Sequence, residues 1–219
     1  MIPAPPIDLQ EVGKAAVIAL VIAGAVCVSE AAWIHAKASL AQALISAAWR
    51  REHAGSRSAQ PWPWADTRPL AQLTFGEGAD APKFMVLEGS SGRNLAFGPT
   101  HDPASVMPGE PGNSVIEGHR DTHFALLREI NLGDTLHIET VTERDVAFVV
   151  TNLRIVDSRR TRISLRADGP RLTLVTCYPF DAVIPGGPLR FIVTADRQEL
   201  RRTPPTGPGQ RPKARDPFN

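Results

Sequence analysis

Between Lys83 and Ala195 the chain alternates short apolar runs with turn residues, the pattern of a fold built from many short strands. The runs are KFMVLEG, NLAFG, NSVIEG, DTLHIET, DVAFVVTNLRIV, PRLTLVTC and LRFIVTA. Glycine, proline and aspartate separate them, and strands of this length and spacing are typical of an antiparallel barrel or sandwich. The pattern therefore predicts a mainly β domain over residues 81–199.

One stretch of this domain, residues 121–130, has the spacing of a helix instead. Asp121 would cap its N-terminus, and the helix would end near Gly133. The side chains expected to face the core are Phe124, Leu126 and Leu127. We therefore expect one or two short helices among the strands.

The N-terminal quarter of the chain has a continuous apolar run in place of alternation. Ala15–Val28 holds fourteen residues with no charge, short of the ~20 that span a bilayer. Extending the run to Ile34 reaches that length and leaves Glu30 and Trp33 near the interface. We predict an uncleaved signal anchor. The alternatives are a signal peptide cleaved at a small-x-small sequence within residues 36–43 and a helix buried in a soluble protein.

Helical character should continue beyond the apolar run, since residues 31–53 contain no glycine or proline. The apolar face predicted for this stalk comprises Trp33, Ala36, Leu40, Ala43, Leu44 and Ala47. Residues 1–54 are thus assigned to the anchor and stalk, and residues 55–80 to a linker. The Pro61–Trp64 segment of the linker is expected to pack across the β domain, a recognition patch being the alternative. The proline-rich tail, residues 200–219, is predicted to be disordered.

Composition narrows the class of protein further. The 219 residues have room for one domain of ordinary size plus extensions. Lysine and arginine total 24 against 23 acidic residues. This nearly balanced charge excludes a protein whose main function is to bind nucleic-acid phosphates. A hydrophobic fraction of 42% excludes a wholly disordered chain. Cys27 and Cys177 cannot make a disulfide scaffold, and Cys27 is expected to be a small hydrophobe within the apolar run.

Three residues at the ends of apolar runs are candidates for chemistry. Cys177 ends a strand, on the face that it shares with Thr173 and Val175, and a lone cysteine there is either a nucleophile or a buried structural thiol. His119 follows another run, and an imidazole can form an ion pair with a thiolate or protonate a departing amine. Arg190 alternates with the apolar residues of LRFIV, where it could stabilise an oxyanion or simply lie on the surface.

The segments around these residues resemble the sortase family, the cysteine transpeptidases that cut sorting signals of LPxTG type. LTLVTCYPF matches the TLxTC signature of sortases, MPGEPGNSVIEGHRDTHF resembles the segment that carries their histidine, and GGPLRFIV resembles their arginine strand. The histidine, cysteine and arginine also follow the sortase order along the chain. The resemblance covers residues 81–195, and PWPWADT after an N-terminal anchor is similar to the sortases of Gram-negative bacteria.

This resemblance implies a fold and a set of roles. The fold would be a sortase-like closed β-barrel of about eight strands. Cys177 would attack the Thr–Gly carbonyl of the sorting signal and form a thioacyl intermediate, His119 would protonate the leaving amine and deprotonate the incoming one, and Arg190 would bind the substrate and its oxyanion. Thr176 would lie beside the scissile bond. His101 would line the cleft, a turn histidine being the alternative.

No metal or other cofactor is expected. Some sortases bind calcium, but the sequence has no convincing acidic cluster. His123 lies four residues after His119, a spacing that zinc ligands use on a helix, yet no third and fourth ligand are evident. We therefore predict that His123 lies on the helix surface and that Asp121 caps the helix instead of joining the catalytic groups.

Together these inferences predict a membrane-anchored cysteine transpeptidase of the thiol-protease type. Its partners would be a surface protein with an LPxTG-like C-terminal sorting signal and an amine acceptor that the sequence does not identify. A single-pass helix would hold the barrel on the periplasmic side of the inner (cytoplasmic) membrane, a placement that rests on the enzymology because basic residues flank the apolar run on both sides. Two other hypotheses stay open: a cysteine endopeptidase that hydrolyses the same signal, and a non-catalytic peptide-binding barrel.

Overall fold

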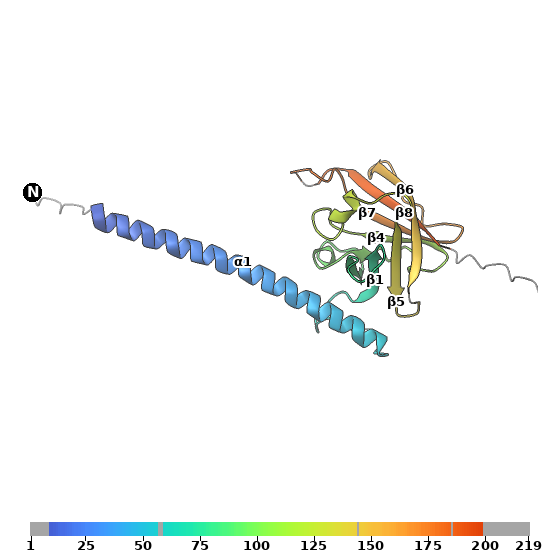
Figure 1. Cartoon of the computed structure of the whole chain (residues 1–219), viewed down its shortest axis with the longest axis horizontal. Coiled ribbons are helices and arrows are strands. Elements are labelled where there is room, and N and C mark those ends of the chain that lie inside the picture. The colour runs from blue at the N-terminus through green and yellow to red at the C-terminus, as the bar shows by residue number, and fades with distance from the viewer. Residues whose placement is uncertain (1–8, 57–58, 144, 185, 199–219) are drawn as a thin grey trace, which may run out of the picture.

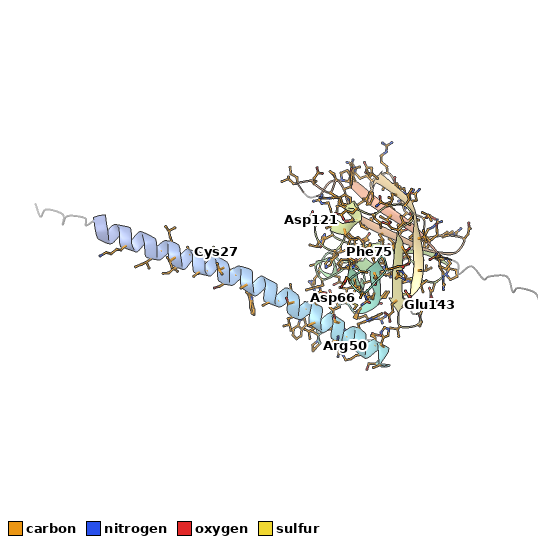
Figure 2. The ribbon with its side chains drawn as sticks, viewed as in Figure 1. Cys27, Arg50, Asp66, Phe75, Asp121 and Glu143 are labelled. Carbon is orange, nitrogen blue, oxygen red and sulfur yellow. The ribbon has the colours of Figure 1, made fainter. Side chains whose placement is uncertain are left out.

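A long helix, α1 (Leu9–His53), leads into the β domain and lies against it with its C-terminal part (Figure 1). The computed structural model describes residues 9–56, 59–143, 145–184 and 186–198, so the predicted disorder of residues 200–219 lies outside the described residues. Within that range, no helical stretch combines the length and the apolar character needed to cross a bilayer. The N-terminal part of α1 projects beyond the barrel, with Cys27 on it (Figure 2). Its exposed apolar side chains include Ile18, Leu20, Val21, Ile22, Val26 and Val28.

The face of α1 that packs on the domain differs from the predicted one. Its buried apolar residues are Ala41, Ile45, Ala48 and Trp49. By contrast, Trp33 and Leu40 of the predicted face are 61% and 60% exposed. An alanine-rich helix offers apolar positions at helical spacing on more than one side, so the pattern alone did not select the contacting face. From the contacting part of α1, Gln42 donates from Nε2 to the Phe97 carbonyl at 2.6 Å.

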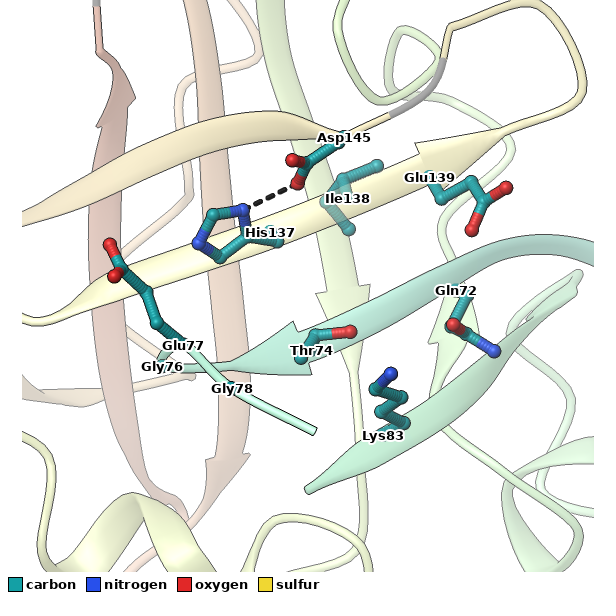
Figure 3. Close-up of a pocket in the computed structure, with 10 residues that line it drawn as sticks. All are labelled: Gln72, Thr74, Gly76, Glu77, Gly78, Lys83, His137, Ile138, Glu139 and Asp145. Atoms are coloured by element: carbon teal, nitrogen blue, oxygen red, sulfur yellow. Dashed lines mark hydrogen bonds and ion pairs between the residues drawn. The ribbon is translucent and has the colours of Figure 1, made fainter. Parts of the chain in front are cut away.

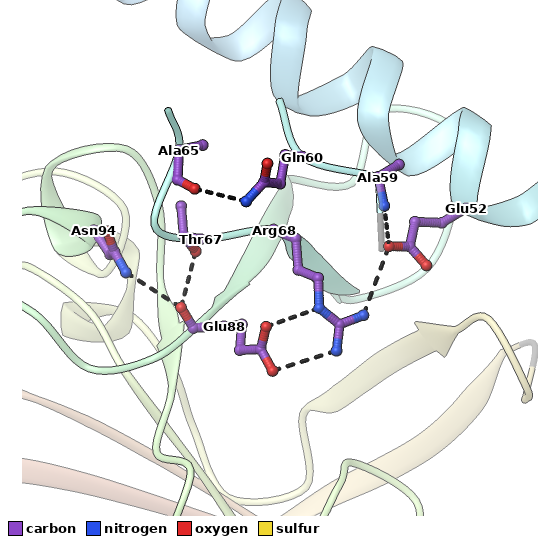
Figure 4. A network of polar contacts seen from close by, with 8 residues as sticks. All are labelled: Glu52, Ala59, Gln60, Ala65, Thr67, Arg68, Glu88 and Asn94. Atoms are coloured by element: carbon purple, nitrogen blue, oxygen red, sulfur yellow. Dashed lines mark hydrogen bonds and ion pairs between the residues drawn. The ribbon is translucent and has the colours of Figure 1, made fainter. Parts of the chain in front are cut away.

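A polar network fixes the end of α1 to the domain (Figure 4). The buried Glu52 carboxylate accepts from the Ala59 backbone N–H at 2.8 Å and lies 3.6 Å from Nη1 of Arg68. Arg68 in turn donates from Nε to Glu88 at 2.8 Å. The bond to Glu88 raises the pKa of the Arg68 guanidinium, and the two carboxylates together hold it charged. One arginine thereby connects the helix to the first two strands.

The eight strands that the structure describes close into a barrel in the order β1-β2-β3-β4-β7-β8-β6-β5. They are β1 (Pro69–Phe75), β2 (Lys83–Glu88), β3 (Thr100–His101), β4 (Gly112–Glu117), β5 (Thr135–Thr140), β6 (Val146–Asp157), β7 (Pro170–Cys177) and β8 (Leu189–Arg197). The pairs β2–β3 and β4–β7 run parallel, and the other neighbours run antiparallel. The mainly β closed barrel expected from the sequence is confirmed.

The predicted boundary between linker and barrel at residue 80 is wrong, because β1 lies within the segment assigned to the linker. Leu70 and Ala71 are adjacent in sequence and both buried, and the register of β1 on β2 shifts between Pro69 and Ala71. A shift of this kind breaks the strict alternation of apolar and polar side chains, so the sequence pattern did not reveal this strand. A second correction concerns NLAFG, where Asn94–Ala96 forms a 3-10 turn, η1, instead of a strand.

The proline-tryptophan segment ahead of β1 packs on the domain with only one of its two indoles. Trp62 contacts the Phe97 ring edge-on, with ring centroids 5.4 Å apart. Trp64 is 82% exposed. The predicted packing across the domain is thus confirmed for Trp62 and wrong for Trp64.

The helix predicted over residues 121–130 is replaced by turns and a short 3-10 helix, η2 (Ala125–Arg128). The buried side chains of residues 121–130 are Phe124, Leu127 and Ile130. These recur every three residues, and a 3-10 helix with three residues per turn aligns that spacing on one face better than an α-helix does. Asp121 therefore caps no helix, and the N-cap position of η2 belongs to Phe124.

Alternation along β7 decides which side chains face the barrel interior. Leu172 and Leu174 are fully buried in the core, together with Ile116 of β4 and Val193 of β8. Cys177 lies on the opposite face, since successive side chains of a strand point to opposite sides. The same strand thus supplies core residues and the candidate nucleophile.

Candidate active site

Cys177 and Arg190 are directly opposite each other on neighbouring strands. The antiparallel register of β7 and β8 pairs their Cα positions. Side chains of such a pair lie on the same face, about 5 Å apart at Cβ. Cys177 is a free, half-buried thiol. An arginine and a thiol therefore share the outer face at the end of β7.

His119 reaches the same end of the barrel through β4. Because β4 and β7 are parallel, both strands end at the same edge of the sheet. The Gly118 backbone N–H donates to the Val175 carbonyl at 3.0 Å, and the Gly118 carbonyl accepts from the Thr176 hydroxyl at 2.8 Å. His119 follows directly, with an exposed side chain. The backbone of the predicted histidine is thus tied to the last residues of the cysteine strand.

Backbone carbonyls orient the Arg190 guanidinium. Its Nη1 donates to the carbonyl of Gly187 at 2.7 Å and to that of Leu189 at 2.9 Å. Among the described residues these bonds use only Nη1, so Nε and Nη2 of the guanidinium can still donate to a partner. The structure therefore brings the ends of β4, β7 and β8, with His119, Cys177 and Arg190, to one region. Their catalytic roles stay predictions.

Thr176 and His101, predicted to bind substrate, are both buried. The Thr176 hydroxyl donates to the Gly118 carbonyl, so it supports the turn that carries His119. Nε2 of His101 lies 2.9 Å from the Val106 carbonyl and 3.0 Å from the Ser105 hydroxyl. These contacts hold the loop between β3 and β4. A direct contact of either residue with substrate stays a prediction.

Two residues beside His119 differ from their predicted settings. His123 is half-buried instead of lying on a helix surface, and its ring contacts Phe84 edge-on at 5.8 Å. Burial lowers the pKa of His123, and the nearby His119 lowers it further. Asp121 pairs with Arg120, which donates from Nε at 2.9 Å and lowers the pKa of the carboxyl. In the described part of the chain, no group of three or more His, Cys, Asp or Glu side chains is arranged to hold a metal ion.

Glu117, the last residue of β4, is a charged group at the site that the sequence reasoning missed. Burial raises the pKa of its carboxyl, the nearby Asp102 raises it further, and Arg190 opposes both effects. Glu117 is opposite Val175 in the β4–β7 register, one alternation step before Cys177. The signal available was an acidic residue ending an otherwise buried strand, GNSVIE.

Replacing Glu117 by glutamine is expected to stabilise the protein more at pH 7 than at pH 4. The native state binds this proton more tightly than the unfolded chain, whose carboxyl has a pKa of 4.5. The free energy of unfolding therefore falls as the pH rises above that value. Glutamine does not ionise, so Glu117→Gln removes this pH-dependent loss of stability. Thermal unfolding at both pH values measures the difference. Glu129→Gln, at an exposed position, is the control, and an equal shift of Tm at both pH values would contradict the assignment.

A pocket of about 500 Å³ lies away from these residues, on β1, β2 and β5 (Figure 3). Nδ1 of His137 lies 2.6 Å from the Asp145 carboxylate at its wall. None of the residues that line it is a candidate catalytic residue. The order of strands places β1 and β5 on the side of the barrel opposite β7. The pocket is thus separate from the region around Cys177.

Comparison with known proteins identifies one family along most of the barrel. The sortase domain matches residues 79–198, more than half of the chain. Sortase D of Bacillus subtilis (strain 168) is 33% identical over 113 residues, which are 51% of this chain and 56% of that protein. The chain thus spans little more than half the length of this relative.

Solved structures share the fold. The sortase D5 transpeptidase of Clostridium perfringens is 25% identical, with a TM-score of 0.51 over 60% of this chain and 80% of the other. Sortase A of Corynebacterium diphtheriae is 20% identical, with a TM-score of 0.53 over 75% of this chain and 87% of the other. Neither comparison places the chain in the Gram-negative subclass, which stays a prediction.

Proposed function

Because the chain belongs to the sortase family, we propose that it is a cysteine transpeptidase that cleaves an LPxTG-like sorting signal and transfers the protein to an amine. The observation that supports this most directly is the pairing of Cys177 with Arg190 across β7 and β8. The hydrogen bond from Gly118 to Val175 holds the segment that carries His119 at the same end of the barrel. A nucleophile, a proton carrier and a fixed cation are what acyl transfer to an amine requires.

The first half-reaction forms the acyl-enzyme. The Cys177 thiolate attacks the carbonyl carbon of the Thr–Gly bond, and the C–S bond forms as the negative charge moves to the carbonyl oxygen. The Arg190 guanidinium stabilises that oxyanion. Collapse breaks the C–N bond, and the departing amine takes a proton from the His119 imidazolium.

The second half-reaction reverses these roles with a new amine. The amine attacks the thioester carbon and passes a proton to His119 as the C–N bond forms. The C–S bond then breaks and returns the thiolate of Cys177. Water in place of the amine would give hydrolysis, the endopeptidase alternative.

Membrane anchoring through α1, with the barrel on the periplasmic side of the inner membrane, is part of the same proposal. The exposed apolar side chains between Ile18 and Val28 support it, because such a surface in water is unfavourable. Trp33, also exposed, follows where an interfacial aromatic residue would lie. Alkaline extraction of membranes from expressing cells tests the idea. Release of the full chain into the soluble fraction would refute it.

Product analysis tests the transpeptidase activity. We expect the purified chain, incubated with an LPxTG-containing peptide and triglycine, to yield the peptide cut after threonine and joined to triglycine by a new amide. Mass spectrometry distinguishes this product from the free acid that water produces. Free acid at every triglycine concentration would favour the endopeptidase. No cleavage, together with slow thiol alkylation that loss of His119 does not change, would favour a peptide-binding barrel.

A further inference from the structure

Arg120, the residue after the predicted catalytic histidine, is a buried cation whose donors are largely satisfied. Its side chain is only 8% exposed. Nη1 donates to the Pro179 carbonyl at 2.8 Å, Nη2 donates to the Ala182 carbonyl at 3.1 Å, and Nε donates to Asp121 at 2.9 Å. A buried guanidinium is stable only when its N–H groups are paired. Here two of the partners are backbone carbonyls about 60 residues away in sequence.

Both carbonyls belong to the loop that begins directly after Cys177. A second arginine from the same segment, Arg128, donates from Nη2 to the Phe180 carbonyl at 3.0 Å and lies 5.6 Å from that ring. The loop has an exposed tip, with Val183 95% and Ile184 82% exposed. Two guanidinium groups from the histidine segment therefore hold the base of this loop, next to its exposed Val183 and Ile184.

Because Arg120 donates to the carbonyl of Pro179, two residues after Cys177, its position also places a charge near the thiol. The hydrogen-bonded Asp121 carboxylate is the main reason why the pKa of Arg120 is raised, and the proximity of Cys177 and Asp181 raises it further. The titratable and charged groups at this end of the barrel thus include His119 and Arg120 from one segment, Glu117 from β4 and Arg190 from β8, and Asp181 of the loop lies near Arg120. Unlike an imidazole, a guanidinium keeps its charge at every physiological pH.

We propose that Arg120 is a positioning residue for the proposed transpeptidation. Its guanidinium joins the segment of His119 to the loop after Cys177, so that imidazole and thiolate keep their separation while substrate binds and leaves. It also contributes a permanent positive charge beside the thiolate. The inference rests on the proposed function for its catalytic consequence, and on the hydrogen bonds of Arg120 for its geometry.

Arg120→Gln and Arg120→Lys separate the two contributions, since glutamine keeps donors without the charge and lysine keeps the charge without the planar fork. We expect Arg120→Gln to lower kcat about 10- to 100-fold, the usual effect of small misplacement of reacting groups, with KM changed less than about threefold. Arg120→Lys should recover part of the lost kcat. Exchange of the Ala182 amide, measured by hydrogen exchange, should be faster in both variants.

Alkylation of Cys177 reports the charge without any peptide substrate. The ratio of the rates with anionic iodoacetate and neutral iodoacetamide should fall about threefold in Arg120→Gln, which corresponds to about one kT of local potential. The ratio should stay at the wild-type value in Arg120→Lys. A purely structural role would change both rates by the same factor. These measurements are made in a Cys27→Ala background, which leaves one thiol.

Two other arginines serve as matched controls. Arg128→Gln should loosen the loop without changing the alkylation ratio, and Arg93→Gln, which removes an exposed ion pair with Asp66, should change neither. An unchanged ratio in Arg120→Gln, or an equal drop in Arg128→Gln, would overturn the inference. If Arg120→Gln does not fold, Arg120→Lys tests the inference instead. A wild-type kcat in that variant would show that the planar guanidinium is not needed. Absence of peptide cleavage by the wild type would instead refute the proposed function, and the alkylation ratio and amide exchange would still test Arg120.

Discussion

Cys177→Ala is expected to lose cleavage of an LPxTG-containing peptide by about 10⁴-fold or more, to the limit of detection. The proposed reaction runs through a thioester, and alanine offers no atom that can form one. The barrel should remain folded, since the half-buried side chain at the end of β7 makes no hydrogen bond that the structure describes. A change of about 1 kcal/mol or less in the free energy of unfolding is expected. Peptide cleavage followed by mass spectrometry, with circular dichroism for the fold, measures both.

The second cysteine provides a matched control for this experiment. Cys27 is exposed on the projecting part of α1 and lies outside the candidate site. Cys27→Ala should therefore cleave the peptide at the wild-type rate. Activity retained in Cys177→Ala, or lost equally in both variants, would rule out Cys177 as the nucleophile.

Gly118→Ala is expected to destabilise the barrel and to impair the site at once. A Cβ at this position would lie 2.5 Å from Cδ2 of Phe124, a ring that is fully buried in the core. Overpacking of this kind costs about 1–3 kcal/mol. Because His119 is the next residue, the backbone shift that relieves the clash should also move the imidazole and lower kcat about tenfold or more. Chemical denaturation and peptide cleavage measure the two effects.

A double-mutant cycle identifies the clash as the cause. In a Phe124→Leu background the added methyl group has more room, so Gly118→Ala should cost less there than in the wild type. Gly92→Ala, where a Cβ meets nothing within 4 Å, is the control and should be close to neutral. Equal costs of Gly118→Ala in both backgrounds would contradict the steric explanation.

Alternation of side chains explains how much of the fold and the site the sequence could predict. Leu172 and Leu174 face the core, so the position of Cys177 on the other face followed from counting along one strand. The outward direction of Arg190 followed in the same way. That the two residues are opposite each other did not follow, because the register between β7 and β8 depends on the whole barrel.

What the sequence could not predict depends on contacts between distant segments. Arg120 bonds to the carbonyls of Pro179 and Ala182, and a backbone carbonyl leaves no mark in an amino-acid pattern. The helix expected after Asp121 was wrong because apolar residues at a spacing of three fit both helix types over one or two turns. Burial of Phe124 against Gly118 is part of what distinguishes the two, and that contact exists only in the folded chain.

Because β4 and β7 are bonded directly to each other, the geometry of the candidate site does not depend on the length of the chain segment that connects these two strands. The hairpin of β5 and β6 comes between these strands in sequence but lies beside β8 and β1 in the barrel. Lengthening the β5–β6 hairpin at its turn, next to the exposed Val141, would leave the hydrogen bonds between β4 and β7 untouched. That turn is therefore a natural place to graft a reporter or a second domain onto the barrel without disturbing the candidate site.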